Sequence, residues 1–205
     1  MNNVLFVTKK KAISSIENDY KLLSPKYKLI VINYESLHKI PDIKWDMIIC
    51  DEAHSLGAFP KPNKRARDIK NIINKTRAKV VLLSGTPTPE SYSQIYHQVY
   101  GIKQNPFNMY VNFYKFAHNH VRIKERKING LYIRDYSHGL DEIIDMMKPY
   151  TINFSQKQAG FKTNIKEKVL YVDMEDLTYD VTSKLKRDKV VEGEEDIDSV
   201  LSNLS

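Results

Sequence analysis

The sequence predicts an α/β fold in which a mostly parallel sheet is flanked by helices. Four short runs rich in apolar and β-branched residues indicate buried strands: VLFVT (4–8), LIVIN (29–33), WDMIIC (45–50) and KVVLL (79–83). Segments with helical spacing separate these runs, which is typical of strand–helix–strand units with a parallel sheet. Polar residues directly follow two of the strands, at the sheet edge where ligands bind in such folds.

The first half of the chain alternates strands and helices. A first helix is expected over 11–23, where four apolar residues recur at helical spacing: Ile13, Ile16, Tyr20 and Leu23. A short turn or helix over 35–40 follows the second strand. The second helix is expected over 63–75, with basic residues facing outward and three isoleucines facing inward: Ile69, Ile72 and Ile73. Ser84-Gly85-Thr86-Pro87 ends the fourth strand.

The second half predicts a mixed helical and hairpin extension. Two stretches rich in Tyr and Phe, around 92–100 and 109–119, are expected to be helical. Residues 121–136 predict a β-hairpin, because Asn129-Gly130 is a preferred sequence for a type I′ turn. The last expected elements are a short helix at 140–147, a strand at 166–173 and a helix from Asp173 or Glu175 through about Lys186.

The charge of the chain is unevenly distributed. The 205 residues hold 32 Lys and Arg against 25 Asp and Glu, a net charge of +7. Residues 191–205 contain five acidic side chains and no basic one, so residues 1–190 carry 32 basic against 20 acidic side chains, or +12. A body this basic suits polyanions such as nucleic acid or nucleotide phosphates, while a plainly solvated surface is the alternative explanation.

Composition also excludes several classes of protein. The single cysteine, Cys50, leaves no partner for an internal disulfide and no Cys-based zinc site. The longest apolar runs, such as Met47–Cys50 and Val80–Leu83, are far too short to span a bilayer. No cationic segment precedes the first apolar run, as it would in a signal peptide. We therefore expect a soluble, cytoplasmic protein without a membrane partner.

The strongest local pattern is Asp51-Glu52-Ala53-His54 after the strand MIIC. Two adjacent carboxylates at a strand end are costly to desolvate without a cationic partner. A Mg²⁺ ion bound to a phosphate chain supplies one, since Mg²⁺ prefers a few carboxylates together with phosphate oxygens and water. In phosphoryl transfer to water, one carboxylate holds the metal and its neighbour polarises the attacking water. A solvated turn at a strand end is the alternative.

Ser84-Gly85-Thr86 follows the next strand, about 30 residues further on. Gly85 permits a tight turn, and the two hydroxyls can exchange hydrogen bonds with a nearby carboxylate or with His54. Taken alone this is a polar loop. The joint occurrence of a strand with DEAH and a strand with SGTP is far more specific than either half.

Together these segments resemble the motifs of superfamily 2 helicases and translocases. WDMIICDEAH and VVLLSGTP resemble motifs II and III, VLFVTKKKAISSIENDY resembles motif Ia, and LIVINYESLHKI resembles the Ib-like strand that follows. They cover residues 4–90 in the family's order. The Tyr/Phe-rich stretch and KVLYVDMEDLTYDVTSKL resemble the end of the first motor lobe of Snf2-like proteins, particularly phage-encoded ones, and this resemblance implies a bacterial or phage-infected host cell.

The resemblance implies a RecA-like first motor lobe of the P-loop NTPase type. We expect its core with motifs Ia, II and III in residues 1–90, the rest of the lobe with an aromatic helical and hairpin insertion in 91–190, and an acidic tail or linker in 191–205. The family hydrolyses ATP between two such lobes and moves along nucleic acid. The implied cofactors are ATP and Mg²⁺, and the implied partners are nucleic acid, with double-stranded DNA favoured, and a second lobe or the rest of a split motor.

The resemblance also assigns roles by position. Asp51 would bind Mg²⁺, Glu52 would be the base that orients water, and His54 would connect the nucleotide site to motif III. Ser84 and Thr86 of motif III would be its coupling partners, and the expected cofactor-binding residues are Ser84, Gly85 and Thr86. Three lysines follow the motif Ia strand, where the family touches the phosphate backbone: Lys9, Lys10 and Lys11. A solvated helix start is the alternative for each lysine.

The family also needs a phosphate loop, GxxxxGK[ST], on a strand upstream of motif Ia. The 205 residues contain no such loop, and Gly160-Phe161-Lys162-Thr163 is only a near match in the wrong half of the chain. Loss of an arginine finger, which the second lobe would supply, lowers the rate by roughly 10³–10⁵. We therefore expect a first-lobe fragment of an ATP-dependent motor that hydrolyses ATP poorly or not at all by itself.

Two other classes remain open on the sequence. A non-catalytic nucleic-acid-binding module would keep the basic lobe and could use exposed aromatic residues of the second half: Tyr110, Phe113, Tyr114 and Phe116. A metal-dependent nuclease would need further ligands around Asp51 and Glu52. The six histidines are scattered, and only His118 and His120 are close, at a spacing that aligns them poorly on a helix or a strand.

Overall fold

The computed structural model describes residues 2–128, 131–154, 158 and 160. The chain divides into two units, Met1–Asn153 and Phe154–Ser205, and the first is described below. The predicted strand at 166–173, the last helix, the acidic tail and the near-match segment 161–163 lie outside the described residues. The predicted domain boundaries at 90 and 190 stay predictions.

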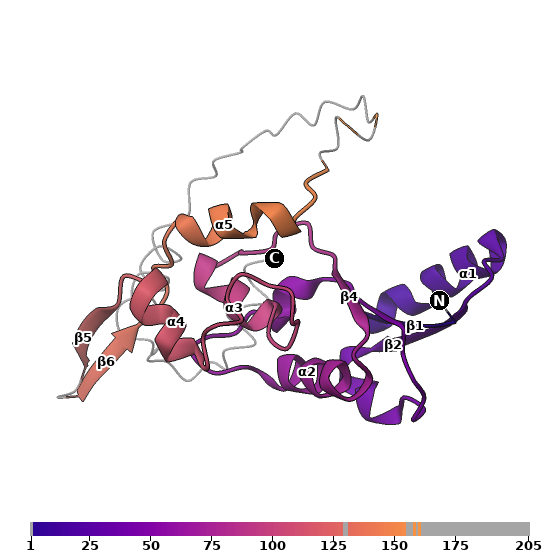
Figure 1. Cartoon of the computed structure of the whole chain (residues 1–205), viewed down its shortest axis with the longest axis horizontal. Coiled ribbons are helices and arrows are strands. Elements are labelled where there is room, and N and C mark those ends of the chain that lie inside the picture. Colours follow the sequence, from indigo (N-terminus) through magenta and orange to yellow (C-terminus); the bar gives the residue numbers. More distant parts are fainter. Residues whose placement is uncertain (1, 129–130, 155–157, 159, 161–205) are drawn as a thin grey trace, which may run out of the picture. The chain divides into compact units, whose positions relative to one another are not determined.

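A four-stranded parallel sheet forms the centre of the first unit (Figure 1). Its strands are β1 (Asn3–Thr8), β2 (Lys28–Asn33), β3 (Met47–Cys50) and β4 (Lys79–Leu82), in the order β2-β1-β3-β4. All three neighbouring pairs are parallel. The predicted α/β fold with a mostly parallel sheet is therefore confirmed, although the third strand begins at Met47 rather than at Trp45.

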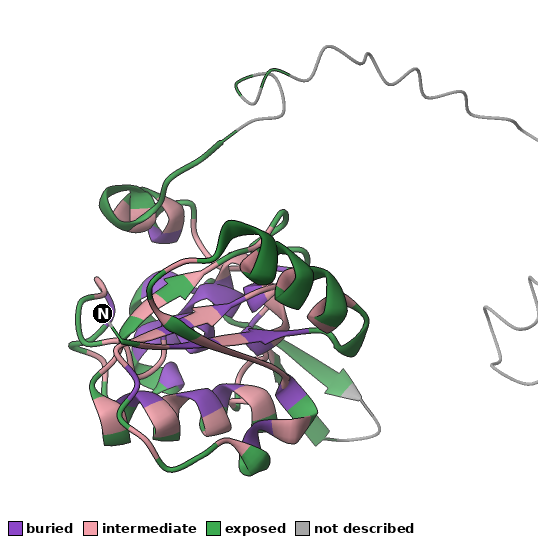
Figure 2. Ribbon diagram, turned by 90° about the vertical axis from the view of Figure 1, so that its right-hand side faces the viewer, coloured by how far each residue is buried: buried purple, intermediate pink, exposed green. Residues whose placement is uncertain are grey.

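Helices lie on both sides of this sheet (Figure 2). The 3₁₀ turn η1 (Lys10–Ala12) leads into α1 (Ile13–Leu23), while η2 (Tyr34–Lys39), η3 (Ala53–Leu56) and α2 (Lys64–Thr76) follow in order. The side chain of Asn63 caps α2 by accepting a hydrogen bond from the backbone N–H of Ala66. No residue of α1 is fully buried, and Leu23 is 76% exposed.

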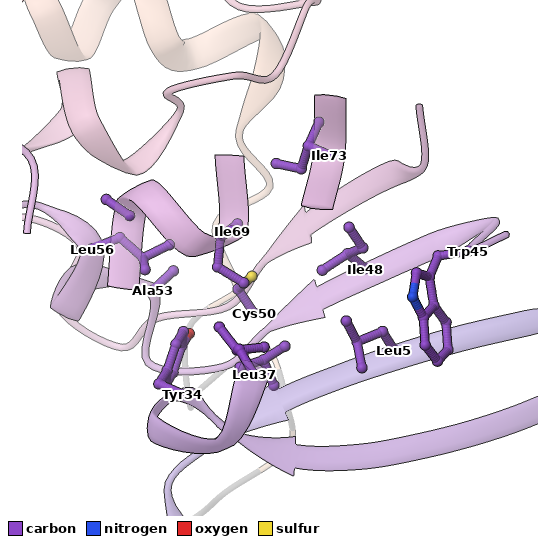
Figure 3. Close-up of a cluster of buried hydrophobic side chains, with 12 residues drawn as sticks. Leu5, Tyr34, Leu37, Trp45, Ile48, Cys50, Ala53, Leu56, Ile69 and Ile73 are labelled. Atoms are coloured by element: carbon purple, nitrogen blue, oxygen red, sulfur yellow. The ribbon is translucent and has the colours of Figure 1, made fainter. Parts of the chain in front are cut away.

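The first hydrophobic core lies between the sheet and α2 (Figure 3). Leu5 and Ile48 of the sheet face Ile69 and Ile73 of α2, and the indole of Trp45 is also buried in this cluster. The inward placement predicted for Ile69 and Ile73 is correct, whereas Ile72 is only partly buried. The opposite face of β4 is more open, since Val81 is 37% and Leu83 is 42% exposed.

The second half holds short helices and a β-hairpin. The helical elements are η4 (Tyr92–Gln94), α3 (Ile95–Gln98), α4 (Phe113–His120), α5 (Glu142–Met147) and η5 (Lys148–Tyr150). The predicted hairpin is present as β5 (Lys124–Ile128) and β6 (Leu131–Asp135), which pair antiparallel. Asn129 and Gly130 lie outside the described residues, so the turn type stays a prediction. In the described ranges, no helix has the length and apolar character needed to cross a membrane.

An aromatic core holds this half together. The side chains of Tyr96, Phe107, Phe113 and Phe116 pack against one another, with Phe116 fully buried at their centre. α4 begins at Phe113 and not at Met109 as predicted, because Asn112 caps it by accepting a hydrogen bond from Lys115 N–H. Leu82 and Ile102 pack against both cores, which joins the sheet to the aromatic cluster.

Candidate functional site

The predicted site residues come from three neighbouring strands that end at one edge of the sheet. Lys9 follows β1, Asp51 and Glu52 follow β3, and Ser84 follows the β4 strand by two residues. The backbone connects these ends, since Asp51 N–H donates to Val7 C=O (2.8 Å) and Ala53 N–H donates to Leu83 C=O (2.9 Å). The parallel register thus brings motif-bearing loops together that are far apart in the sequence.

Asp51 is fixed by side chains from two other elements. Thr8 Oγ1, fully buried at the end of β1, donates a hydrogen bond to Asp51 Oδ2 at 2.7 Å. Tyr34 of η2 donates its hydroxyl proton to the Asp51 carbonyl oxygen at 2.6 Å. Sequence reasoning missed Thr8 and Tyr34, although each lies at the end of a predicted strand. The Thr8 contact orients the carboxylate of Asp51, and the Tyr34 contact holds its backbone.

Burial in this region suppresses ionisation of two neighbouring groups. Burial raises the pKa of Tyr34 well above its ordinary value, and the nearby Cys50 and Asp51 raise it further. Burial likewise raises the pKa of the Cys50 thiol to about 12. Both groups are therefore neutral at physiological pH, and Tyr34 can serve as a hydrogen-bond donor to Asp51.

Glu52 has a left-handed backbone conformation, with φ 50° and ψ 44°. This region is uncommon for residues with a Cβ, and such conformations cluster at functional sites. The turn directs the carboxylate toward two cationic or hydrogen-bonding partners. Lys9 Nζ lies 3.1 Å from Glu52 Oε1, and His54 Nδ1 lies 3.2 Å from Glu52 Oε2.

His54 lies between Glu52 and the loop that follows β4. Its Nδ1 is 3.1 Å from Ser84 Oγ and 3.2 Å from Glu52 Oε2. A proton on Nδ1 can be donated to the carboxylate, while an unprotonated Nδ1 can accept the hydroxyl proton of Ser84. The imidazole therefore links the two loops, and its tautomer decides which loop it binds.

The remaining predicted residues make fewer contacts with the rest of the site. Thr86 contributes its backbone N–H, which donates to Ser84 Oγ at 3.3 Å, and its side chain is exposed. Gly85 does not have a positive φ, and a Cβ placed on it meets no atom within 4 Å. The turn therefore does not use the positive φ that a glycine allows. Lys10 and Lys11 are exposed at the start of η1, while Lys9 contacts Glu52.

The donor set fits a magnesium ion that is shared with phosphate and water. Within the described residues, no group of three or more His, Cys, Asp and Glu side chains is arranged to hold a metal by itself. Asp51 and Glu52 offer adjacent carboxylates, of which Asp51 is already oriented by Thr8. Because Mg²⁺ keeps several waters and takes one or two carboxylates at nucleotide sites, this set suits it. It does not suit a two-metal nuclease.

The aromatic residues that could have bound nucleic acid belong mostly to the core. Phe113 and Phe116 are 2% and 0% exposed, and Tyr110 is only partly exposed. Tyr114, at 48%, is the most accessible of the four. A cavity of about 450 Å³ lies beside this cluster, lined among others by Lys70, Tyr100 and Tyr110, and none of the predicted catalytic residues lines it.

Comparisons with known proteins agree with the motifs. The sequence pattern of the SNF2-related domain matches residues 3–202. Two similar curated proteins are the DNA repair and recombination proteins RAD54B of Homo sapiens and Gallus gallus, at 29% and 27% identity over 92 residues. Each alignment covers 41% of this chain and 10% of the relative, so the matched part spans about a tenth of the length of these relatives.

Proposed function

The chain belongs to the SNF2-related domain family, and on this premise we propose that it is part of the first motor lobe of an ATP-dependent DNA translocase or helicase of the DEAH-containing, Snf2-like type. The observation that carries the proposal is the contact of His54 with both Glu52 and Ser84. It joins the loop after β3 to the loop after β4, as a site that couples hydrolysis to movement requires. RAD54B, named a DNA repair and recombination protein, supports DNA as the partner.

Each residue has a defined role in this proposal. Asp51, oriented by Thr8, would hold Mg²⁺ bound to the nucleotide phosphates, and this ion would neutralise the charge that develops on them. Glu52 would orient the attacking water and accept its proton once the carboxylate is released from Lys9. His54 would pass the state of Glu52 to Ser84, because one Nδ1 proton cannot serve both partners fully.

The motor would need parts that the 205 residues do not contain. No GxxxxGK[ST] loop occurs in the sequence, and the backbone amides of such a loop supply most of the hold on the β- and γ-phosphates. We propose that the chain alone hydrolyses ATP poorly or not at all, and that a second lobe or the rest of a split motor completes the site.

The experiment compares ATP hydrolysis by the 205-residue chain and by Glu52→Gln, with Mg²⁺ and with or without duplex DNA. The expected result is no turnover that distinguishes the two proteins. A turnover that Glu52→Gln abolishes would show that the chain is a complete ATPase and would overturn the proposed dependence on further parts. A duplex-binding assay on the same preparations tests whether DNA is the partner, since a chain that does not bind DNA contradicts a role as a DNA motor lobe.

The second candidate is a non-catalytic DNA-binding module that retains the lobe fold. The ion pair between Lys9 and Glu52 favours it, because the proposed base is held by a cation of its own chain. The surplus of +12 over residues 1–190 is a further argument. The two candidates differ in whether a nucleotide changes the DNA affinity once a phosphate loop and a second lobe complete the site, since the 205 residues alone are expected to hold nucleotide weakly in either case.

A further inference from the structure

The β5–β6 hairpin is a two-stranded ribbon that is exposed on both faces and projects beyond α4 (Figure 1). Within the described residues its strands pair only with each other, with Lys127 opposite Tyr132 and Arg126 opposite Ile133. Leu131 and Tyr132 are each 71% exposed, and Ile133 is 50% exposed. The ribbon therefore presents apolar and aromatic side chains to solvent without adding to either hydrophobic core.

The base of the ribbon is anchored, whereas the arm itself has no structural role in the described unit. Tyr136, directly after β6, is buried and lies 5.5 Å from Phe113 between ring centres. Arg122 N–H donates to His138 C=O at 2.9 Å, and Asp135 accepts hydrogen bonds from Ser137. Since an isolated hairpin is marginally stable and its open edges invite aggregation, an exposed ribbon of this kind points to a binding role.

The ribbon is cationic, and part of its positive charge is unpaired. Residues 122–135 contain five Lys and Arg against two carboxylates, a surplus of +3. Both carboxylates form ion pairs within the ribbon: Glu125 with Arg134 at 3.0 Å, and Asp135 with Arg126 at 3.6 Å. Among the described residues, three exposed cations of this segment have no ion-pair partner: Arg122, Lys124 and Lys127.

Part of the basic helix α2 is engaged differently. Arg65 pairs with Glu35, Lys75 pairs with Asp42 at 2.6 Å, and Lys70 lies over the ring of Tyr100 at 3.5 Å. These three cations of α2 are thus engaged by the chain itself. In the described part of the ribbon, Lys127 has only the more distant ring of Tyr132, at 5.6 Å, and its charge remains available to a partner of opposite charge.

We propose that the β5–β6 ribbon is a DNA-binding arm that lies against the phosphate backbone of a duplex. The major groove of B-form DNA admits a two-stranded β-ribbon, which is the shape and the two-sided exposure seen here. Arg122, Lys124 and Lys127 contact phosphates, while Tyr132 supplies apolar contact beside Lys127, whose Nζ lies 5.6 Å from its ring centre. This inference rests on the proposed function. It adds a DNA contact that is distant from the carboxylate edge, by which we mean the sheet edge with Asp51 and Glu52.

The test measures the affinity of the full chain for a fluorescein-labelled DNA duplex by fluorescence anisotropy over a series of salt concentrations. The ribbon variant combines Arg122→Gln, Lys124→Gln and Lys127→Gln. The control variant combines Lys21→Gln, Lys26→Gln and Lys28→Gln, three exposed lysines on α1, the loop after it and the start of β2. The two variants change the net charge equally.

The ribbon variant is expected to bind at least about tenfold more weakly and to show a salt slope smaller by about three, one for each lost phosphate contact. The control is expected to keep the wild-type slope. Equal affinity and slope for the ribbon variant and the wild type would overturn the inference and leave the proposed function standing. An equal loss of affinity in the control variant would do the same. Absence of duplex binding by the wild type would overturn both. Unchanged circular dichroism shows that the variants are folded.

Discussion

At the scale of single residues, the candidate site depends on groups that carry no chemistry themselves. Thr8 and Tyr34 hold the side chain and the backbone of Asp51, each through one hydrogen bond. Glu52 is held by its left-handed backbone and by its contacts with Lys9 and His54. A carboxylate that orients water must itself be oriented, so the supporting residues decide whether the reactive ones can work.

The first prediction concerns Thr8→Val, which removes the hydroxyl and keeps the shape of the side chain. Thr8 is fully buried and its hydroxyl donates to a carboxylate, so the substitution is expected to lower the free energy of unfolding by about 1–2 kcal/mol. Urea unfolding measures this. Thr151→Val is the control, since its hydroxyl bonds only the exposed Met147 carbonyl, and it is expected to stay within about 0.5 kcal/mol. Equal effects would mean that the contact with Asp51 contributes nothing.

The second prediction concerns His97, which is 3% exposed and packs against Phe113. Burial lowers the pKa of His97, although its hydrogen bond to Ala58 C=O opposes the shift. A folded-state pKa below the unfolded value of about 6.5 means that this contribution to stability is complete above that pH and is lost as the pH falls toward the folded pKa. The side-chain amide of asparagine can still donate a hydrogen bond to the Ala58 carbonyl, but it does not titrate.

We therefore expect His97→Asn to lose less stability than the wild type when the pH is lowered from about 7.5 to about 5.5, as followed by urea unfolding. The comparison uses the change in the free energy of unfolding between the two pH values, because the smaller asparagine side chain destabilises the core at both of them. The exposed His118 on α4 provides the control, and His118→Asn should keep the wild-type loss. A wild-type loss that is unchanged in His97→Asn would exclude His97 as the titrating group.

The sequence selects the proposed functional residues of the candidate site, but not the residues that support them. Asp51, Glu52 and Ser84 could be selected because each follows a recognisable strand in a joint pattern. Thr8 appeared only as the last residue of a strand, and its role depends on the register that places it beside Asp51. The pairing of Lys9 with Glu52 could not be predicted either, because it depends on which side of the turn Glu52 faces.

At the scale of elements, a chain of hydrogen bonds joins α4 and α5 to the turn before α4. His120 Nδ1 lies 2.6 Å from Glu142 Oε1, and because a carboxylate only accepts, Nδ1 carries the proton. His120 Nε2 then accepts the hydroxyl proton of Tyr110 at 2.7 Å, and the Tyr110 oxygen accepts from Asn119 at 3.1 Å. Every group in this chain has a partner, which lets a mostly buried histidine connect two helices.

The third prediction is that Tyr110→Phe destabilises the protein by about 1–3 kcal/mol, because it leaves Nε2 of the buried His120 without a donor. Thermal or urea unfolding measures the change. Tyr114→Phe is the matched control, since in the described part of the chain its hydroxyl has no hydrogen bond, and it should change stability by less than about 0.5 kcal/mol. If Tyr110→Phe behaves like Tyr114→Phe, water replaces the lost hydroxyl.

Elements with strong local signals were predicted well. The hairpin depended on Asn129-Gly130 between two alternating segments, and α2 depended on a clear apolar stripe. α4 was predicted four residues too early because Asn112 caps it, a local hydrogen bond that overrides the apolar residues before it. From the sequence alone, Phe113 and Phe116 could belong either to the core or to a binding surface. Their packing against Tyr96 shows that they belong to the core.

At the scale of the whole chain, the two proposed activities use different regions of the surface. The carboxylate edge lies at the ends of β1 and β3, while the β5–β6 ribbon extends from the aromatic half. Coupling would need a bound nucleotide to alter the loop after β4, which continues toward η4 and the aromatic core. A ligand shifts an equilibrium only by its difference in affinity for the two states, so a chain that holds nucleotide weakly cannot couple strongly.

The last prediction follows from this argument. In the presence of Mg²⁺, the duplex DNA affinity of the 205-residue chain is expected to be the same with and without a non-hydrolysable ATP analogue, because the sequence contains no GxxxxGK[ST] loop to hold the phosphates. Fluorescence anisotropy at fixed ionic strength measures it, with free Mg²⁺ held constant so that screening of the phosphates does not change. Asp51→Asn serves as the control. An affinity that the analogue changes in the wild type but not in Asp51→Asn would mean that the carboxylate edge binds nucleotide unaided, and the chain would then be a coupled lobe in its own right.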